Sequence, residues 1–221
     1  MKPESFQHEN VDYQSSSYLS KSRWISYWYQ INEVHQTTAN ASVLEIGPGN
    51  NLVTGVLRGM GHQVKTVDRD WKTKPDYLTD VRQLSDTVQE QFDTVLCCEI
   101  LEHLPFKDFE MVLLDLRKVS REHLIVTLPY STRGTFTPYI VFKFLPFMKP
   151  ISWLHIFPIC TRAHIPTHPL GHQWEIGKKG YPLKRIRKCF KTAGWSIKKQ
   201  YPIFENPYHY LFVCEKNAMV R

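Results

Sequence analysis

Apolar runs of β-strand length alternate with amphipathic helical segments along most of this chain. In the stretch VLEIGPGNN, 43–51, an apolar strand leads through a Gly-Pro-Gly turn into a helical segment, 52–60. A second strand, 62–68, completes a β-α-β unit. Strands that alternate with helices form a largely parallel sheet with helices on both faces, and such sheets bind ligands at the carboxyl ends of their strands. The chain is therefore predicted to have an α/β fold with the glycine turn at its ligand-binding edge.

The same alternation continues through the rest of the chain. We expect apolar strands at 92–100 and 122–129, and helices at 108–119 and 182–193. The closing runs WSIKKQY and YHYLFVCEK are predicted to form an antiparallel pair, because a short loop that contains proline joins them. The expected sheet is mostly parallel with an antiparallel last strand, and helices cover both of its faces in a three-layer αβα arrangement.

With 221 residues, the chain is long enough for one domain with a substantial core. The polar segment 1–17 is expected to be a flexible tail and 18–221 a single domain. Within this domain we expect a helical flank at 18–40 and an insertion at 131–180 that caps the substrate site. The apolar stripe of the helical flank comprises Trp24, Tyr27, Trp28 and Ile31.

The cysteines and the start of the chain favour a cytoplasmic location. The five cysteines have no Cys-x-x-Cys spacing, which fits reduced thiols better than a disulfide framework or a zinc site. The segment 1–14 is polar and contains Glu4, Glu9 and Asp12, so it does not have the character of a signal peptide. We therefore disfavour secretion.

Two residues at the glycine turn distinguish between nucleotide cofactors. A dinucleotide-binding turn has a third small residue, which lets the helix pack on the strand and receive a pyrophosphate, but this chain has Leu52 there. Glu45 lies just ahead of the turn, where its carboxylate would repel a pyrophosphate and tolerate a cofactor with ammonium and sulfonium groups. A nicotinamide-dependent oxidoreductase is therefore the weaker alternative.

The turn and the segments after it resemble the class I S-adenosylmethionine-dependent methyltransferases, in particular the small single-domain enzymes with an E-x-G-x-G turn. The resemblance rests on LEIGPGNN (44–51), on the acid 21 residues after Gly47, and on the segments LTDVRQL (78–84) and DTVLCCEILEHLP (93–105). It implies a Rossmann-like, doubly wound sheet of seven strands, with S-adenosylmethionine as the cofactor.

The resemblance also implies roles for individual residues. Asp68 would accept hydrogen bonds from both ribose hydroxyls, Asp80 would contact the adenine amino group, and Val81 would pack on the adenine ring. Asn51 stands where these enzymes often have a third glycine, and asparagine tolerates the left-handed backbone region that such a turn needs. The cofactor-binding residues implied are Glu45, Gly47, Pro48, Gly49, Asp68, Arg69, Asp80, Val81 and Glu99.

The candidate catalytic residues are His172 and Glu175 in GHQWEIG, with His103 as a third. Methyl transfer is an in-line displacement that depends on positioning, and an acceptor that must lose a proton benefits from a base such as histidine. The two residues of GHQWEIG follow a long irregular segment, where this family commonly builds its acceptor site. The alternative is that Trp174 is packed and that its His and Glu neighbours lie on the surface.

No metal ion is expected. His164, His168 and His172 recur every four residues and lie near Glu175, but the prolines between them prevent the continuous helix that would align them. Their spacing also matches no strong metal-binding signature.

The acceptor is expected to be a small or lipid-linked molecule that is methylated on an O, N or C atom. The segment 135–160 is unusually apolar, but lysines and prolines interrupt it, so it does not read as a transmembrane helix. We expect broken amphipathic helices there, which wall the acceptor pocket or dock peripherally on a membrane. The segment 178–199 has nine Lys or Arg and no Asp or Glu. This basic segment is either a solvated helix face or a surface for an anionic partner.

Two other functions stay open. An RNA methyltransferase fits the clustered positive charge, although the strand that begins at residue 92 is followed by CEILEHLP and not by the Asn/Asp-Pro-Pro-aromatic loop of enzymes that methylate base amino groups. The second is a non-catalytic scaffold or sensor that keeps the fold and binds S-adenosylmethionine.

Overall fold

The computed structural model describes residues 13, 15, 18–37, 39–131 and 171–217, together with the backbone of 139–142 and 151–154. The predicted tail, 1–17, lies outside these residues except for Tyr13 and Ser15, and so does most of the predicted cap, 131–180. The apolar segment 135–160, predicted to wall the acceptor pocket or to dock on a membrane, lies outside them except for the two short stretches of backbone. Among the described residues, no helix combines the length and hydrophobicity that a membrane crossing requires.

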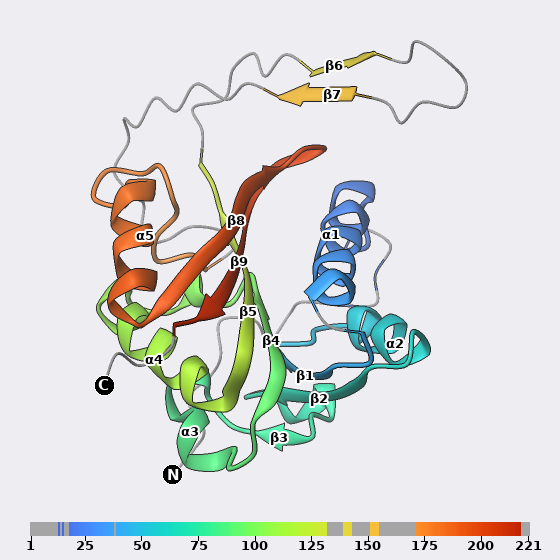
Figure 1. Cartoon of the computed structure of the whole chain (residues 1–221), viewed down its shortest axis with the longest axis vertical. Coiled ribbons are helices and arrows are strands. Elements are labelled where there is room, and N and C mark those ends of the chain that lie inside the picture. Colours follow the sequence, from blue (N-terminus) through green and yellow to red (C-terminus); the bar gives the residue numbers. More distant parts are fainter. Residues whose placement is uncertain are drawn as a thin grey trace.

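A seven-stranded sheet forms the centre of the molecule, with the strand order β3-β2-β1-β4-β5-β9-β8 (Figure 1). Its strands are β1 (Ser42–Ile46), β2 (Gln63–Asp68), β3 (Tyr77–Leu78), β4 (Phe92–Cys98), β5 (Ser120–Pro129), β8 (Trp195–Ile203) and β9 (Asn206–Lys216). Strands β1 to β5 are parallel, and β9 is antiparallel to both of its neighbours. The prediction of a mostly parallel α/β sheet with an antiparallel last strand is confirmed.

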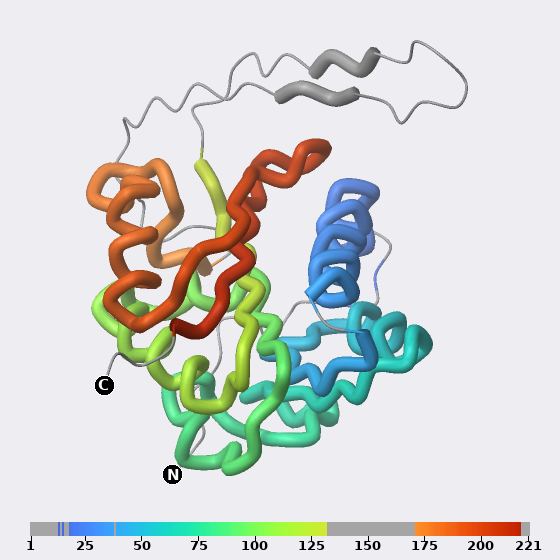
Figure 2. Tube along the Cα trace, in the orientation of Figure 1, coloured from blue at the N-terminus to red at the C-terminus, as the bar shows by residue number. Residues whose placement is uncertain are grey.

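Helices cover both faces of this sheet. The α-helices are α1 (Lys21–Thr37), α2 (Leu52–Gly59), α3 (Leu84–Thr87), α4 (Phe109–Val119) and α5 (Leu183–Thr192). Short 3-10 helices lie at Trp71–Thr73, Val81–Gln83, Leu101–His103 and Phe106–Asp108. Helices α1 and α2 pack on one face, while α3, α4 and α5 pack on the other (Figure 1). The first helix, α1, also contacts β9, so two segments far apart in the sequence lie side by side (Figure 2).

Alternate side chains of each strand supply the two halves of the core. Leu44 and Ile46 of β1 belong to the cluster under α4 and α5, whereas Val43 belongs to the cluster under α1 and α2. The predicted stripe of α4 is buried as expected: Phe109, Val112, Leu113, Leu116 and Val119. Burying side chains of this kind stabilises a fold by roughly 1.5–3 kcal/mol each.

Helix α1 forms as predicted, but it buries only part of the predicted face. Tyr27 and Ile31 are half-buried against the core, whereas Trp24 and Trp28 are 48% and 59% exposed. Ser26 and Gln30, outside the predicted stripe, are buried. The polar side of the helix is turned inward because it lines a cavity, which is described below.

The backbone at 139–142 and 151–154 forms a separate antiparallel pair, β6 (Tyr139–Phe142) and β7 (Ile151–Leu154). The prediction of amphipathic helices across 135–160 is wrong for these two stretches. Both are rich in aromatic and β-branched residues, which favour extended backbone over helix.

Candidate active site

A cavity of about 680 Å³ opens at the carboxyl ends of β1, β2 and β4 and is covered by α1. The chain leaves β1 toward α2 on one face of the sheet and leaves β4 toward α4 on the other. This is the topological switch point, where open α/β sheets hold their ligands. All nine residues predicted to bind a cofactor line the cavity: Glu45, Gly47, Pro48, Gly49, Asp68, Arg69, Asp80, Val81 and Glu99.

The glycine turn gives the cavity its floor. Gly47 has φ of +69°, and a Cβ built there would collide with the Cδ1 atom of Ile100. The backbone angle favours glycine at this position, and any larger residue would also displace the side chain of Ile100. Asn51 has φ of 58°, so the asparagine adopts the left-handed conformation that was expected of it. Its neighbour Asn50 accepts a hydrogen bond from the backbone of Leu52, which starts α2.

Glu45 is a buried acid in the cavity wall. Its Oε2 atom accepts a hydrogen bond from the hydroxyl of Thr54 in α2. Burial raises the pKa of Glu45 to about 7. The side chain of Glu45 therefore connects the strand before the glycine turn to the following helix, and it also lines the cavity.

Asp68 and Asp80 reach the cavity from two successive loops. The Oδ1 atom of Asp68 accepts a hydrogen bond from the backbone of Asp70 at 2.9 Å, and burial raises the pKa of Asp68. Both oxygens of Asp80 accept hydrogen bonds from the guanidinium of Arg82, at 2.9 and 2.8 Å. These hydrogen bonds lower the pKa of Asp80, which keeps that carboxylate charged.

At the other end of the cavity, the three candidate catalytic residues come together. His103 and His172 line the cavity, and their ring centroids are 5.0 Å apart. Glu175 lies behind His172, with 3.0 Å between Glu175 Oε1 and His172 Nδ1. The hydroxyl of Tyr208 donates a hydrogen bond to the same carboxylate oxygen at 2.8 Å.

Hydrogen bonds between two loops hold this arrangement. The backbone of Gln173 donates to the carbonyl of Glu102, and the indole of Trp174 donates to the carbonyl of Leu104 at 3.1 Å. Trp174 is fully buried, as the packing alternative proposed. The other half of that alternative is wrong, because His172 and Glu175 are only 4% and 1% exposed.

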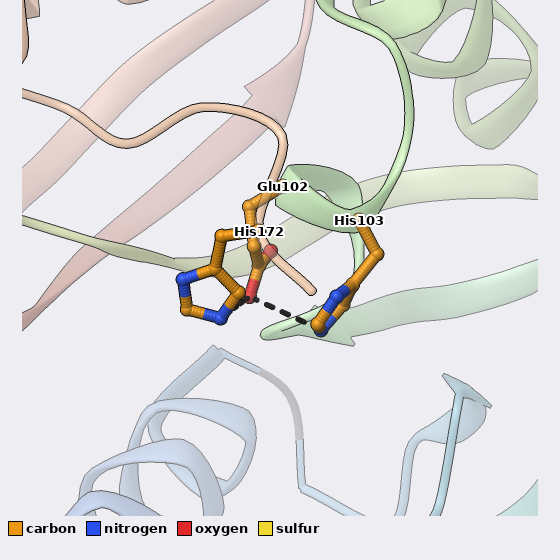
Figure 3. Close-up of side chains that lie close together, drawn as sticks. All are labelled: Glu102, His103 and His172. Carbon is orange, nitrogen blue, oxygen red and sulfur yellow. Dashed lines mark ion pairs between the residues drawn. The ribbon is translucent and has the colours of Figure 1, made fainter. Parts of the chain in front are cut away.

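Sequence reasoning missed Glu102, which lies between the two histidines (Figure 3). Its side chain is fully buried, and neither of its carboxylate oxygens has a hydrogen-bond donor among the described residues. The Oε1 atom lies 3.9 Å from Nε2 of His103 and 3.8 Å from Nε2 of His172. Burial, together with the nearby charge of Glu99, raises the pKa of Glu102 well above its usual range. The only sequence signal was its position next to His103 in ILEHLP.

Glu99 adjoins this group at the end of β4. Its φ is 54°, an unusual value for a glutamate, and strained backbone of this kind is frequent at functional sites. Its Oε2 atom lies 3.5 Å from Nε2 of His209, a histidine whose pKa is lowered by burial.

Two further walls of the cavity were also missed. Helix α1 and the residues before it contribute Tyr18, Ser22, Arg23, Ser26, Tyr27 and Gln30. The start of β9 contributes Asn206, Tyr208 and His209. The polar residues within the amphipathic helix could have indicated that α1 lines the cavity. The aromatic and polar run NPYHY could have indicated the same for the start of β9.

Solved structures with the same fold include proteins that contain a nucleotide-derived ligand. No family model and no curated protein matches the sequence. The structure is similar to that of the 1,6-didemethyltoxoflavin-N1-methyltransferase of Burkholderia thailandensis, which contains 1,6-didemethyltoxoflavin and S-adenosylhomocysteine. That similarity has a TM-score of 0.59 at 16% identity and covers 98% of this chain and 92% of that chain.

Two other solved structures resemble this chain with nearly the same TM-score. The N-methyltransferase NodS of Bradyrhizobium japonicum, in complex with S-adenosylhomocysteine, has a TM-score of 0.58 at 12% identity, covering 90% of this chain and 89% of that chain. An S-adenosylmethionine-dependent methyltransferase of Clostridium acetobutylicum has a TM-score of 0.58 at 13% identity, covering 96% and 94%. The chain therefore has the Rossmann-like fold of the class I methyltransferases, as the resemblance implied.

Proposed function

We propose that this protein is an S-adenosylmethionine-dependent methyltransferase that acts on a small-molecule acceptor. The observation that carries the proposal is that one cavity is lined both by the glycine turn and Asp68 and by His103 and His172. The similar fold of methyltransferases that contain S-adenosylhomocysteine supports the choice of cofactor.

The residues present fit this cofactor. The cavity volume of about 680 Å³ lies within the usual range for cofactor sites. Gly47 leaves the floor of the cavity without a side chain, so that the methionine part can approach the backbone. Asp68, Asp80 and Val81 line the same cavity, and in this proposal Asp68 accepts hydrogen bonds from the ribose while Asp80 and Val81 contact the adenine. Glu45 and Glu99 line the cavity, and a ligand with ammonium and sulfonium groups would favour ionisation of Glu45, whose pKa burial raises to about 7.

When bound, the cofactor supplies an electrophilic methyl group on a sulfonium. The task of the protein is then to hold the nucleophilic atom of the acceptor in line with that group. His172 has the geometry of a general base. The carboxylate of Glu175 can only accept a hydrogen bond, so Nδ1 of His172 carries the proton and Nε2 carries the lone pair. We infer that His172 acts on the acceptor, that Glu175 positions it, and that His103 completes the acceptor end of the site.

The nature of the acceptor is inferred from the site and from the similar structures. Small molecules are the natural class, since 1,6-didemethyltoxoflavin is bound by one structurally similar enzyme. Of the basic residues in 178–199, Lys198 and Lys199 are paired with Glu215 and Glu33. This pairing reduces the positive charge available for RNA. A non-catalytic binding protein would not need a buried histidine and carboxylate pair at the cavity wall.

A lipid-linked acceptor at a membrane surface is the second candidate. The exposed side of α5 favours it, since this helix buries Ile186 and Phe190 and turns Lys184, Lys188 and Lys191 away from the sheet. The apolar segment 135–160 would supply the hydrophobic contact. Flotation with liposomes, with and without anionic lipid, tests this candidate, and no binding to either kind of liposome removes it.

Calorimetry and labelled-methyl transfer together test the main proposal. The purified protein is titrated with S-adenosylhomocysteine and, as the competing ligand, with NAD. We expect S-adenosylhomocysteine to bind and NAD not to bind. Incubation of the protein with cell extract and isotopically labelled S-adenosylmethionine should then give a labelled small molecule by mass spectrometry. Binding of NAD without binding of S-adenosylhomocysteine would overturn the proposal.

A further inference from the structure

Glu102, His103 and His172 form a cluster whose charge is not balanced by hydrogen bonds. A buried carboxylate without a donor is costly, and structures rarely keep one without a partner such as an ion or a proton. Each oxygen of Glu102 is buried and has no donor in the described part of the chain, and the two imidazole nitrogens nearest to Oε1 lie beyond hydrogen-bond distance, at 3.8 and 3.9 Å. These distances suit three groups that share an ion better than three groups that bond to one another.

The two histidines present the correct nitrogen to the centre of the cluster. Glu175 Oε1, at 3.0 Å, fixes the proton of His172 on Nδ1, and the carbonyl of Gly171, at 3.4 Å, does the same for His103. In both rings the lone pair is therefore on Nε2, the nitrogen that points toward Glu102 (Figure 3). An imidazole that donates its other N–H to a carboxylate or a carbonyl is the usual form of a metal-bound histidine.

The separations are compatible with one shared ion. The three ligand atoms all lie within 4.8 Å of one another. Nitrogen and carboxylate ligands lie about 2.0–2.2 Å from zinc, so two ligands of one ion are at most about 4.4 Å apart. The distances from Glu102 to the two histidines, 3.9 and 3.8 Å, satisfy this limit.

We propose that Glu102, His103 and His172 bind one divalent transition-metal ion of the zinc type at the acceptor end of the cavity. Two imidazoles and one carboxylate suit zinc, cobalt, manganese or iron, whereas magnesium and calcium prefer sites made only of oxygen. Three protein ligands leave at least one coordination position open, as catalytic metal sites do. Because His103 and His172 line the cavity, that position faces the acceptor.

The proposed ion changes the role of His172. A general base does not need the second imidazole of His103 or the carboxylate of Glu102 beside it. A metal ion would use both groups as ligands. A bound ion would hold an acceptor hydroxyl and favour loss of its proton to water. The oxygen would then attack the methyl carbon, and the electron pair of the carbon–sulfur bond would pass to sulfur. This consequence rests on the proposed methyltransferase function, but the metal site itself does not.

Cobalt titration of the purified full-length protein tests the site directly. After treatment with a chelator, the protein is titrated with Co²⁺ and followed by visible absorption, and Zn²⁺ is then used to displace the cobalt. We expect one Co²⁺ per chain and a weakening of more than about 100-fold in Glu102→Gln, since changes behind the ligands alone cost about 10–100-fold. Glu175→Gln should weaken binding by about 10-fold or more. His35→Gln, which removes an exposed histidine outside the cluster, should leave it unchanged.

Binding of S-adenosylhomocysteine by the same samples separates this inference from the proposed function. A wild-type protein that binds S-adenosylhomocysteine but gives no cobalt absorption overturns the metal site and means that a proton neutralises Glu102. Equal cobalt affinity in wild type and Glu102→Gln overturns it as well. Should Glu102→Gln fail to fold, His103→Gln is the second test, with the same expected loss. Cobalt binding without binding of S-adenosylhomocysteine supports the site and counts only against the cofactor.

Discussion

The Nδ1 atom of His172 lies 3.0 Å from the Oε1 atom of Glu175, and both side chains are buried at the wall of the cavity. A carboxylate can only accept, so this contact fixes both the tautomer and the orientation of the ring. Tyr208 donates to the same oxygen and holds the carboxylate in place. The lone pair of Nε2 is thereby directed at the acceptor end of the cavity, whether it meets a proton or a metal ion.

Replacing His172 by alanine should lower methyl transfer with little effect on cofactor affinity. His172 is not among the predicted cofactor-binding residues, so the dissociation constant of S-adenosylhomocysteine should change by less than about three-fold. The rate of labelled-methyl transfer should fall by about 10²–10⁴-fold, the range for loss of an acid–base group. His35→Ala is the matched control. If His172→Ala loses S-adenosylhomocysteine binding and cooperative unfolding together, then the residue is only part of the packing.

Replacing Gly47 by alanine should abolish cofactor binding and destabilise the fold. The new Cβ meets Ile100, and φ of +69° is unfavourable for alanine, so the free energy of unfolding should fall by about 1–3 kcal/mol. Gly55→Ala is the matched control, because Gly55 lies inside α2 with open space around it. That control should gain about 0.5–1 kcal/mol. Urea unfolding and calorimetry measure both effects, and tight ligand binding by Gly47→Ala would contradict the assigned floor of the cavity.

Replacing Asp68 by asparagine should weaken S-adenosylhomocysteine binding by about 10–100-fold, since charge-assisted hydrogen bonds to the ribose are worth about 1.5–3 kcal/mol. Asp86→Asn, an exposed aspartate outside the cavity, should bind as the wild type does. Titration calorimetry compares the three proteins. An unchanged affinity in Asp68→Asn would mean that this side chain serves only its own turn, through the hydrogen bond from Asp70.

The stability of the wild-type protein should fall as the pH rises from about 4.5 to about 7, because of Glu45. Burial raises the pKa of Glu45 from its ordinary value of 4.5 to about 7, so the folded state holds a proton that the unfolded state has released. This loss in the free energy of unfolding is complete above pH 7 and is on the order of 3 kcal/mol. Glu45→Gln cannot ionise and should lack this contribution.

Urea unfolding of wild type and Glu45→Gln near pH 5 and near pH 8 measures the difference. The variant should gain stability relative to the wild type at the higher pH. Other buried acids, such as Asp68, contribute equally to both proteins, so the comparison isolates Glu45. A constant difference between the two proteins at both pH values would contradict the raised pKa.

The cofactor end of the cavity could be predicted from local sequence. Glu45, Gly47 and Asp68 lie at or near the carboxyl ends of parallel strands, and the geometry of a parallel sheet brings such ends to one edge. The strands themselves were visible as apolar runs, and Asn51 was compatible with the turn because of its own backbone preference. In these cases, short-range pattern and final structure agree.

Other features depended on contacts that no local pattern contains. Helix α1 was identified from its periodicity, but its buried side is polar because it covers the cavity. The stretches that form β6 and β7 were expected to be helical, although their composition favours strands.

The sequence by itself determined the sheet, the glycine turn and the set of residues at the strand ends, because each follows from the alternation of side chains and the conformational needs of a few backbone positions. Only the tertiary structure decided that Glu102, His172 and Tyr208 meet at one point. They come from the turn after β4, the loop before α5 and the start of β9, and hydrogen bonds between those segments fix their separation. The charge of a buried carboxylate depends on what surrounds it in space, and that neighbourhood exists only after the chain has folded.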